Sequence, residues 1–351
     1  MNNKLLILNL GVDAENTSLA FTQKWINELS LNYLKVDVIT LKVGKKYKLN
    51  ENVSLHYVNK NDSSYSKIHQ LKMLNKITKE LIKNNQYSHC FAHMAPLQHL
   101  IAKFYLSQKN IKSTLWFTHA GPKFGIKWLI LFLSSVLANN IVTASKYSFP
   151  FKFKKIQVIG HGINFDNFYN EKLDFSNKNI LILSRISKSK NIENSLDNIV
   201  KCKNFEKFKV DIIGGTLNIQ DEEYLEYLIK KFKKFNNIKF LGKKNHGELP
   251  DLLKKYDINI NNAKKGFFDK AVLETAASGI INFYRSNDFD FLYDEEFNKL
   301  LKFEEDNLFQ KIDEIQEIEK QKVLDNISYA QSRSENHSIK NVVANLIKVF
   351  N

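Results

Sequence analysis

The segment from Lys264 to Gly279, KKGFFDKAVLETAASG, combines residue types that could bind an anion and a diol side by side. A turn at Gly266–Phe268 leads into a run with helical spacing, with Asp269 and Lys270 at its start and Glu274 about one turn further in. The free amides of a first helical turn attract anions, so those near Phe268, Asp269 and Lys270 could hold a phosphate. The Glu274 carboxylate could then accept hydrogen bonds from two hydroxyls, as a nucleotide sugar would require. An ordinary amphipathic helix with a surface glutamate fits this segment equally well.

Two cations follow a predicted strand in the segment LSRISKSKNI. Arg185 and Lys190 lie between that strand and a predicted helix, five residues apart. A planar guanidinium binds a diphosphate through two parallel hydrogen bonds, and a flexible ammonium binds it as a point charge. A solvated basic loop remains the simpler interpretation of this pair when it is considered alone.

Two histidines end predicted strands. His119 in LWFTHAGP precedes a turn at Gly121-Pro122, and His93 occurs in FAHMAP. A single histidine at a strand end is more often a structural hydrogen-bonding group than a catalyst, and His93 fits the structural role better than His119 does.

No metal site is expected. The nine histidines and the cysteines, Cys90 and Cys202, lack the close spacing of zinc ligands. Asp288-Phe289-Asp290 resembles a metal-binding aspartate pair, but nearby acids favour a solvated acidic loop. Two distant cysteines indicate no disulfide framework and fit a reducing cytoplasm. The N-terminus is interpreted as a strand rather than a signal peptide, and the apolar run 128–138 is too short to span a bilayer.

Charge divides the chain of 351 residues into two halves. Residues 1–170 hold 22 lysines against 8 acids, a net charge of +14, and residues 171–351 hold 30 basic against 29 acidic residues, a net charge of +1. No acid occurs from Leu81 to Phe165. This asymmetry predicts an anionic partner such as a membrane surface, although a lysine-rich composition explains part of it. Nucleic acid is not expected, because the aromatic residues are not interleaved with lysines. We expect a buried helix at 128–138; a contact with a membrane surface is the alternative.

Strand-like and helix-like segments alternate along the whole chain. Such alternation predicts parallel sheets covered by helices on both faces, and therefore an α/β fold. Ligands of these folds bind beyond the carboxyl ends of the strands, where Gly11, His93 and His119 are expected. We predict an N-terminal domain at 1–169, a second domain at 170–332 and a final helical segment at 333–351 that packs back toward the first domain.

Several motifs, in this order and spacing, resemble the retaining glycosyltransferases of the GT-B fold, family 4. They are WFTHAGP, IVTAS, VIGHGINFDNF, LSRISKSKNI, VDIIGG, IKFLGKKNHGELPDLL, YDININ and GFFDKAVLETAASG. The resemblance covers nearly the whole chain. It implies two doubly wound Rossmann-like domains that face each other across a cleft, with the acceptor on the first and a nucleoside diphosphate sugar donor on the second.

The resemblance also implies roles for individual residues. Arg185 and Lys190 would hold the donor diphosphate, Glu274 the ribose and amides at Phe268–Lys270 the phosphates. The loop at Gly242-Lys243 would border the nucleobase, Gly11 would join the donor site, and His119 would be catalytic at the transferred sugar. No cofactor is implied. The expected acceptor is a glycan or lipid-linked glycan of surface polysaccharide or lipopolysaccharide synthesis, and the expected location is the cytoplasm or the inner face of the cytoplasmic membrane.

One departure from the family pattern bears on activity. The family carries two glutamates separated by seven residues, and Gly266 stands where the first should be. Asp269 and Lys270 are candidate replacements for its contact with the donor sugar. A smaller departure is Ser184 in place of the usual glycine. A non-catalytic homologue that binds a glycan or lipid is therefore the alternative function.

Overall fold

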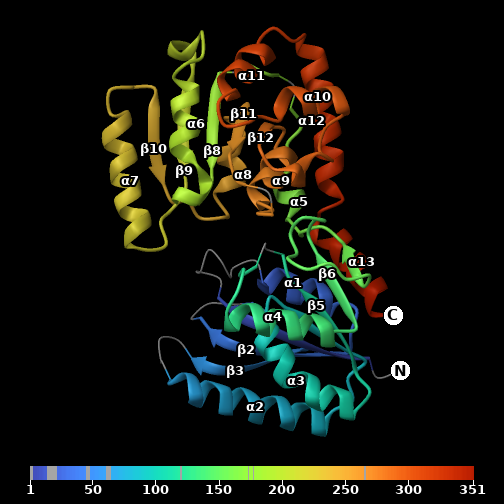
Figure 1. Cartoon of the computed structure of the whole chain (residues 1–351). Helices are drawn as coiled ribbons and strands as arrows, with labels where there is room; N and C mark the ends of the chain where they lie inside the picture. Colours follow the sequence, from blue (N-terminus) through green and yellow to red (C-terminus); the bar gives the residue numbers. More distant parts are fainter. Residues whose placement is uncertain are drawn as a thin grey trace. The chain divides into compact units, whose positions relative to one another are not determined.

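The computed structural model divides the chain into two compact units. The first comprises Met1–Gly162 together with Ile339–Asn351, and the second comprises Ile163–Ser338 (Figure 1). The structure describes residues 3–13, 22–44, 48–60, 65–118, 121–172, 174–176, 178–264 and 266–351. Both units are built on parallel sheets with helices, as the alternating pattern predicts.

The first unit contains a seven-stranded parallel sheet in the order β3-β2-β1-β4-β5-β6-β7. Its strands are β1 (Lys4–Val12), β2 (Lys35–Val43), β3 (Val53–Lys60), β4 (His89–His93), β5 (Lys112–Trp116), β6 (Asn140–Thr143) and β7 (Ile156–Val158). Successive side chains of a strand point to opposite faces. Accordingly Leu5 and Ile7 join the core on one face of the sheet, and Leu6 and Leu8 join the core on the other.

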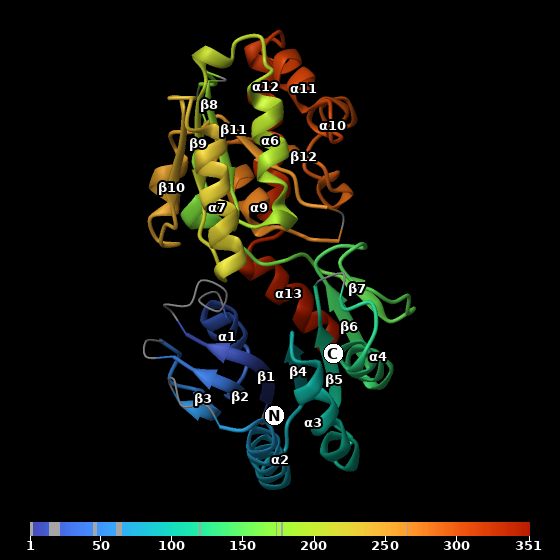
Figure 2. The same cartoon turned by 60° about the vertical axis from the view of Figure 1, so that its left-hand side comes forward.

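Helices cover both faces of this sheet. Helices α1 (Thr22–Ser30) and α13 (Ile339–Phe350) pack together on one face. Helices α2 (Lys67–Asn84), α3 (Pro96–Gln108) and α4 (Ile126–Leu137) pack in sequence on the other (Figures 1 and 2). The final helix therefore belongs to the first unit.

Helix α4 is less buried than its sequence predicts. Only Leu131, Ser134 and Ser135 of this helix are buried. The expectation of a buried helix at 128–138 is therefore wrong, because an apolar composition does not reveal that only one face of the helix meets the sheet. No helix in the described part of the chain has the length and apolar character needed to cross a membrane.

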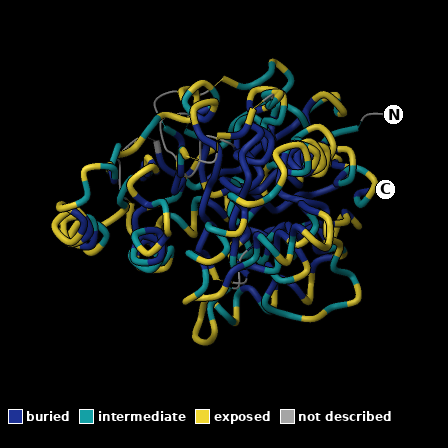
Figure 3. The backbone as a smooth tube through the Cα atoms, turned by 90° about the horizontal axis from the view of Figure 1, so that it is seen from above, coloured by how far each residue is buried: buried dark blue, intermediate teal, exposed yellow. Residues whose placement is uncertain are grey.

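The second unit contains a five-stranded parallel sheet in the order β10-β9-β8-β11-β12. Its strands are β8 (Asn179–Leu183), β9 (Lys209–Ile213), β10 (Ile238–Gly242), β11 (Ile258–Asn261) and β12 (Ile281–Tyr284). Its α-helices are α5 (Phe165–Phe168), α6 (Ile192–Ile199), α7 (Ile219–Phe232), α8 (Leu249–Leu253), α9 (Lys270–Ala277), α10 (Glu295–Leu301), α11 (Leu308–Ile315) and α12 (Lys320–Glu335). Strands β8, β9, β11 and β12 are almost entirely buried, whereas the edge strand β10 is largely exposed or half-buried. Buried segments lie mainly in the interior of the chain and exposed ones at its outside (Figure 3).

The unit boundaries differ from the expected ones at 169/170 and 332/333. Helix α5 packs against α8 and α9, so residues 163–169 belong to the second unit. Asn170, in the polar stretch expected to be a linker, donates its amide hydrogen to Ala277 O and accepts a hydrogen bond from Gln331. Near the second boundary, His337 O accepts a hydrogen bond from Ile163 N–H, and the second unit extends to Ser338. The polar residue Asn170 is therefore hydrogen-bonded within the second unit and does not belong to a linker.

Candidate functional site

The strand order of the second unit creates a natural binding position between β8 and β11. In the sheet, β8 lies between β9 and β11, so the connection after β8 runs to one side of it and the strand β11 pairs with its other side. In open α/β sheets the carboxyl ends of two such strands diverge and leave room for a ligand. Ser184 and Arg185 follow β8, and Asn262 and Ala263 follow β11. The candidate site is therefore at this edge of the sheet.

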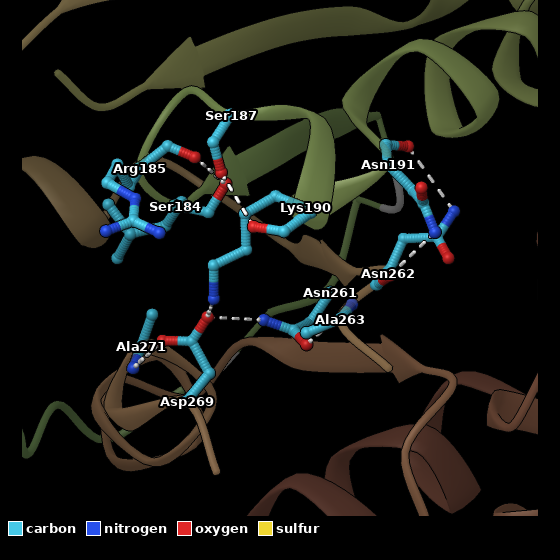
Figure 4. A network of polar contacts seen from close by, with 12 residues as sticks. Ser184, Arg185, Ser187, Lys190, Asn191, Asn261, Asn262, Ala263, Asp269 and Ala271 are labelled. Carbon is cyan, nitrogen blue, oxygen red and sulfur yellow. Dashed lines mark hydrogen bonds and ion pairs between the residues drawn. The ribbon is translucent and has the colours of Figure 1, made fainter. Parts of the chain in front are cut away.

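Lys190 and Asp269 meet at this edge (Figure 4). Lys190 Nζ lies 2.5 Å from Asp269 Oδ2, and Asn261 Nδ2 donates to the same oxygen over 3.1 Å. The other carboxylate oxygen of Asp269 accepts from the Ala271 amide, so Asp269 is the N-cap of α9, as expected. The carboxylate of Asp269 thus occupies the helix end where a phosphate was expected, and it neutralises Lys190.

Asparagines fix the loops around this ion pair. Asn262 Nδ2 donates to Asn194 Oδ1 over 2.8 Å and to Ser195 Oγ over 3.2 Å. The backbone carbonyl oxygen of Asn262 accepts a hydrogen bond from Asn191 Nδ2 over 3.5 Å (Figure 4). These contacts tie the end of β11 to the start of α6. Sequence reasoning missed them, although the alternation of isoleucine and asparagine in ININN signals polar groups in a buried strand.

Arg185 presents a free cation on the same edge. It is exposed, and among the described residues no ion pair involves its guanidinium (Figure 4). Its backbone is held by a glycine loop after β9: Ile186 N–H donates to Gly215 O, and a Cβ on Gly214 would lie 1.7 Å from Ser184 O. The backbone that carries this unneutralised guanidinium is therefore packed directly against the glycine loop.

Glu274 is buried on α9 and is paired with a residue that the sequence did not single out. His246 Nε2 lies 3.0 Å from Glu274 Oε1. The His246 ring is half-exposed and packs edge-on against Phe168, with 5.3 Å between the ring centroids. The carboxylate expected to bind the donor ribose is thus already oriented by a neighbour on the loop after β10.

The turn at Gly266 explains why a glycine replaces the first glutamate of the family pattern. Gly266 has φ +87°, a conformation that favours glycine. Its amide donates to Asp288 Oδ2 over 3.0 Å, and Ser286 Oγ donates to the same oxygen over 2.5 Å. Asp288 is buried, so the expectation of a solvated acidic loop is wrong for it. Of the two aspartates, Asp290 fits that description, since it pairs with Lys302 at the surface.

The side chain of Phe268 belongs to the core. Its ring packs against those of Phe289, Phe291 and His337 at centroid distances of 5.1–6.5 Å. Burial lowers the pKa of His337 to about 4, so this aromatic cluster is neutral at physiological pH. Phe268 could contribute to a ligand site only through its backbone.

The remaining predicted residues divide between the two units. Lys243 is exposed with its stem against Gly215, and Lys270 is the half-exposed first residue of α9. Gly11 is the last but one residue of β1 in the first unit, close to the strand end where it was expected, and its carbonyl oxygen accepts from Thr22. His119 lies outside the described residues. His93 is buried beside Trp25 and Trp116, which supports its structural interpretation. Among the described residues, no group of acidic, histidine or cysteine side chains could hold a metal ion.

Comparisons with known proteins agree with this fold. The model of the family "Glycosyl transferases group 1" matches residues 166–283, and that of "Glycosyl transferase 4-like" matches residues 14–130. No functionally curated protein matches the sequence significantly.

Three solved structures illustrate the likeness. The Anabaena protein HepE in complex with UDP aligns at 14% identity over 98% of each chain, with a TM-score of 0.73. A glycosyltransferase from Rickettsia africae aligns at 15% identity over 100% of this chain and 98% of its own, with a TM-score of 0.74. Sucrose-phosphate synthase from Thermosynechococcus elongatus aligns at 12% identity over 99% and 98%, with a TM-score of 0.73. At such identities these structures show the fold, and the two family models carry the assignment: the chain belongs to the glycosyltransferases of the GT-B fold.

Proposed function

We propose that the chain transfers a sugar from a nucleoside diphosphate sugar to a glycan or a lipid-linked glycan. The observation that carries the proposal is the exposed guanidinium of Arg185 at the β8/β11 edge, on the same edge as Lys190 and the first turn of α9. A diphosphate is the ligand that such an arrangement of fixed amides and cations favours. Glu274 would accept hydrogen bonds from the ribose hydroxyls.

Donor binding on this proposal requires an exchange of partners at Lys190. In the free protein its ammonium is neutralised by Asp269. A diphosphate near α9 would compete with this carboxylate for Lys190, whereas Arg185 has no such competitor among the described residues. Arg185 would therefore make the first contact with the donor, and Lys190 would follow.

The chemical step then follows from where charge develops. The bond between the anomeric carbon and the phosphate oxygen breaks, and the acceptor oxygen bonds to that carbon on the same face. The configuration is retained because the new bond forms on the face that the phosphate leaves, and the acceptor proton passes to the leaving phosphate oxygen. Arg185 and Lys190 stabilise the charge that grows on the leaving diphosphate. We propose that these cations make a metal unnecessary, and turnover that persists in excess chelator would support this.

The acceptor is proposed to bind the first unit. Its excess of lysines suits an anionic glycan or a lipid-linked phosphate. We place the reaction in surface polysaccharide synthesis in the cytoplasm. The two described cysteines, Cys90 and Cys202, are both free and buried, as a reducing compartment would allow.

A thermal-shift panel of nucleotide sugars tests the donor class. A ligand that binds the folded state raises the melting temperature by mass action. UDP sugars come first in the panel, because HepE was solved with UDP and with UDP-glucose. Release of nucleoside diphosphate in the presence of candidate acceptors then tests transfer.

A non-catalytic glycan- or lipid-binding homologue is the second candidate. It is favoured by Gly266 in place of a glutamate and by the neutralised Lys190. Donor binding without any turnover across a broad acceptor panel would favour this candidate over the enzyme.

A further inference from the structure

The outward face of α4 is apolar. Phe124, just before the helix, is 84% exposed and Ile126 is 69% exposed. The exposed apolar side chains that follow are Leu129, Leu133, Val136 and Leu137. Their spacing of three, four or one residues places them on one side of the helix. We call Phe124 and these five residues of α4 the α4 surface.

The α4 surface is held by a well-packed helix. Leu131 on the opposite side of α4 enters the sheet core. Trp128 and Phe132 stack on each other and contact Phe151 edge-on, with ring centroids 5.6 and 5.4 Å away. The exposed apolar side chains therefore project from a fixed support, and nothing in the described part of the chain covers them.

Lysines occur at the start of α4 and in the segment that packs on it. Lys123 and Lys127 are exposed at the start of α4. Lys152 and Lys154 alternate with the aromatic residues that pack on the helix, and both are exposed. The stretch 81–165 contains ten lysines and no acid.

The C-terminal end of α4 is also positively charged. Lys155 Nζ donates to Val136 O over 2.7 Å and to Ala138 O over 2.5 Å. Burial lowers the pKa of Lys155 because it disfavours the charged form, but two carbonyl oxygens of the helix end accept its hydrogen bonds. A cationic border around an exposed apolar helix face is the pattern of a helix that lies in a membrane interface.

We propose that the α4 surface binds the headgroup region of an anionic lipid bilayer. Its apolar side chains would enter the acyl boundary, and its lysines would contact lipid phosphates. Charge argues against a second copy of the chain as the occupant. A two-fold contact through this face would bring two sets of lysines together with no acid in residues 81–165 to offset them. The proposal does not depend on the donor site, which lies in the other unit.

Vesicle co-sedimentation of the full chain tests this proposal. We expect binding to phosphatidylglycerol–phosphatidylcholine vesicles, little binding to phosphatidylcholine alone, and a loss of binding as salt rises. The double variant Leu129→Glu/Leu133→Glu should bind at least about tenfold more weakly, because two acids would enter the interface. Both positions are exposed, so the fold should survive, and an unchanged melting temperature checks this.

A matched control comes from α7 in the second unit. Ile219→Glu/Ile229→Glu also places two acids at exposed isoleucines of a helix and should leave vesicle binding unchanged. A milder variant, Lys123→Ala/Lys127→Ala, should weaken binding about fivefold per lysine and reduce its salt dependence. The proposal is overturned if the α4 variant binds like the wild type, or if the α7 variant loses as much. It is also overturned if light scattering shows a dimer that the α4 variant dissociates.

Discussion

The two units share a strand order around their first strand but differ in what lies at the equivalent edge. In both sheets the first strand lies between the second and the fourth, and the third strand lies beyond the second. In the first unit, the last residue of the fourth strand is His93, which is packed between Trp25 and Trp116. In the second unit the corresponding edge presents Arg185 and the Lys190–Asp269 pair. Topology offers a binding position in both units, and different side chains stand beside it in each.

The units also differ in net charge and in their exposed apolar surface. The nearly neutral second half concentrates its charges in pairs, such as Lys190 with Asp269 and Lys231 with Glu193. The basic first half leaves lysines beside an exposed apolar helix. This contrast is consistent with the proposed donor binding by the second unit and the proposed contact of the first unit with acceptor or membrane.

The largest expected effect is that of His119→Ala, which should separate transfer from nucleotide binding. His119→Ala should reduce transfer on the order of a hundredfold, because the resemblance places this histidine at the transferred sugar. The affinity for free nucleoside diphosphate should stay nearly unchanged, since the resemblance implies that His119 contacts the transferred sugar and not the nucleotide. Initial rates and calorimetry measure the two quantities. A comparable loss of nucleotide binding would mean that His119 supports the fold instead.

Much of this contrast could be predicted from the sequence. Strand-like and helix-like segments that alternate predict both sheets, because a strand buried on two faces is a continuous apolar run and its covering helix has apolar residues at helical spacing. Motif order predicts Arg185 and Glu274 as site residues. Three contacts were not predicted: Lys190 with Asp269, His246 with Glu274, and Asp288 with Gly266. Each joins residues distant in sequence or on different loops, and a composition pattern carries no information on which loops meet.

Restoring the family glutamate should damage the second unit rather than improve it. Gly266→Ala should cost about 1–2 kcal/mol of unfolding free energy, because an L-residue is strained at a positive φ. Gly266→Glu should cost more, since it also buries a carboxylate beside Asp288. Urea unfolding followed by circular dichroism measures both costs. An unchanged or more stable Gly266→Glu variant would refute this account of the turn.

The first unit should lose stability in mild acid through its buried histidines. Burial lowers the pKa of His89 and of His99 to about 3 in the folded state, below the ordinary value near 6.5. The unfolded chain therefore binds more protons below pH 6.5, and stability falls as the pH falls. Each histidine should cost about 2 kcal/mol at pH 5.

Tryptophan fluorescence can follow this loss selectively. All three tryptophans, Trp25, Trp116 and Trp128, lie in the first unit, so their emission during urea unfolding reports on it alone. His99→Gln removes one titrating group and should flatten the dependence on pH between 7 and 5. An equally steep dependence in this variant would show that His99 is not responsible.

The smallest expected effect concerns the pair at the α9 terminus. Asp269→Asn keeps a good N-cap but removes the charge that neutralises Lys190. Nucleoside diphosphate should bind up to about fivefold more tightly, because a partly exposed ion pair that must break on binding costs at most about 1 kcal/mol. If Asp269 instead replaces the missing glutamate, the variant should bind the nucleotide sugar less well while its affinity for the free nucleotide is unchanged. Calorimetry with both ligands distinguishes these roles.

The most direct test of the proposed donor site is calorimetric titration of UDP into wild type, Arg185→Ala and Asp269→Asn. Losing a charge-assisted hydrogen bond costs about 1.5–3 kcal/mol, so Arg185→Ala should weaken binding about tenfold or more. Asp269→Asn should shift the affinity in the opposite direction. Opposite shifts from two residues on the same edge would support a diphosphate site at the β8/β11 edge. UDP that binds the wild type and both variants with the same affinity would contradict it.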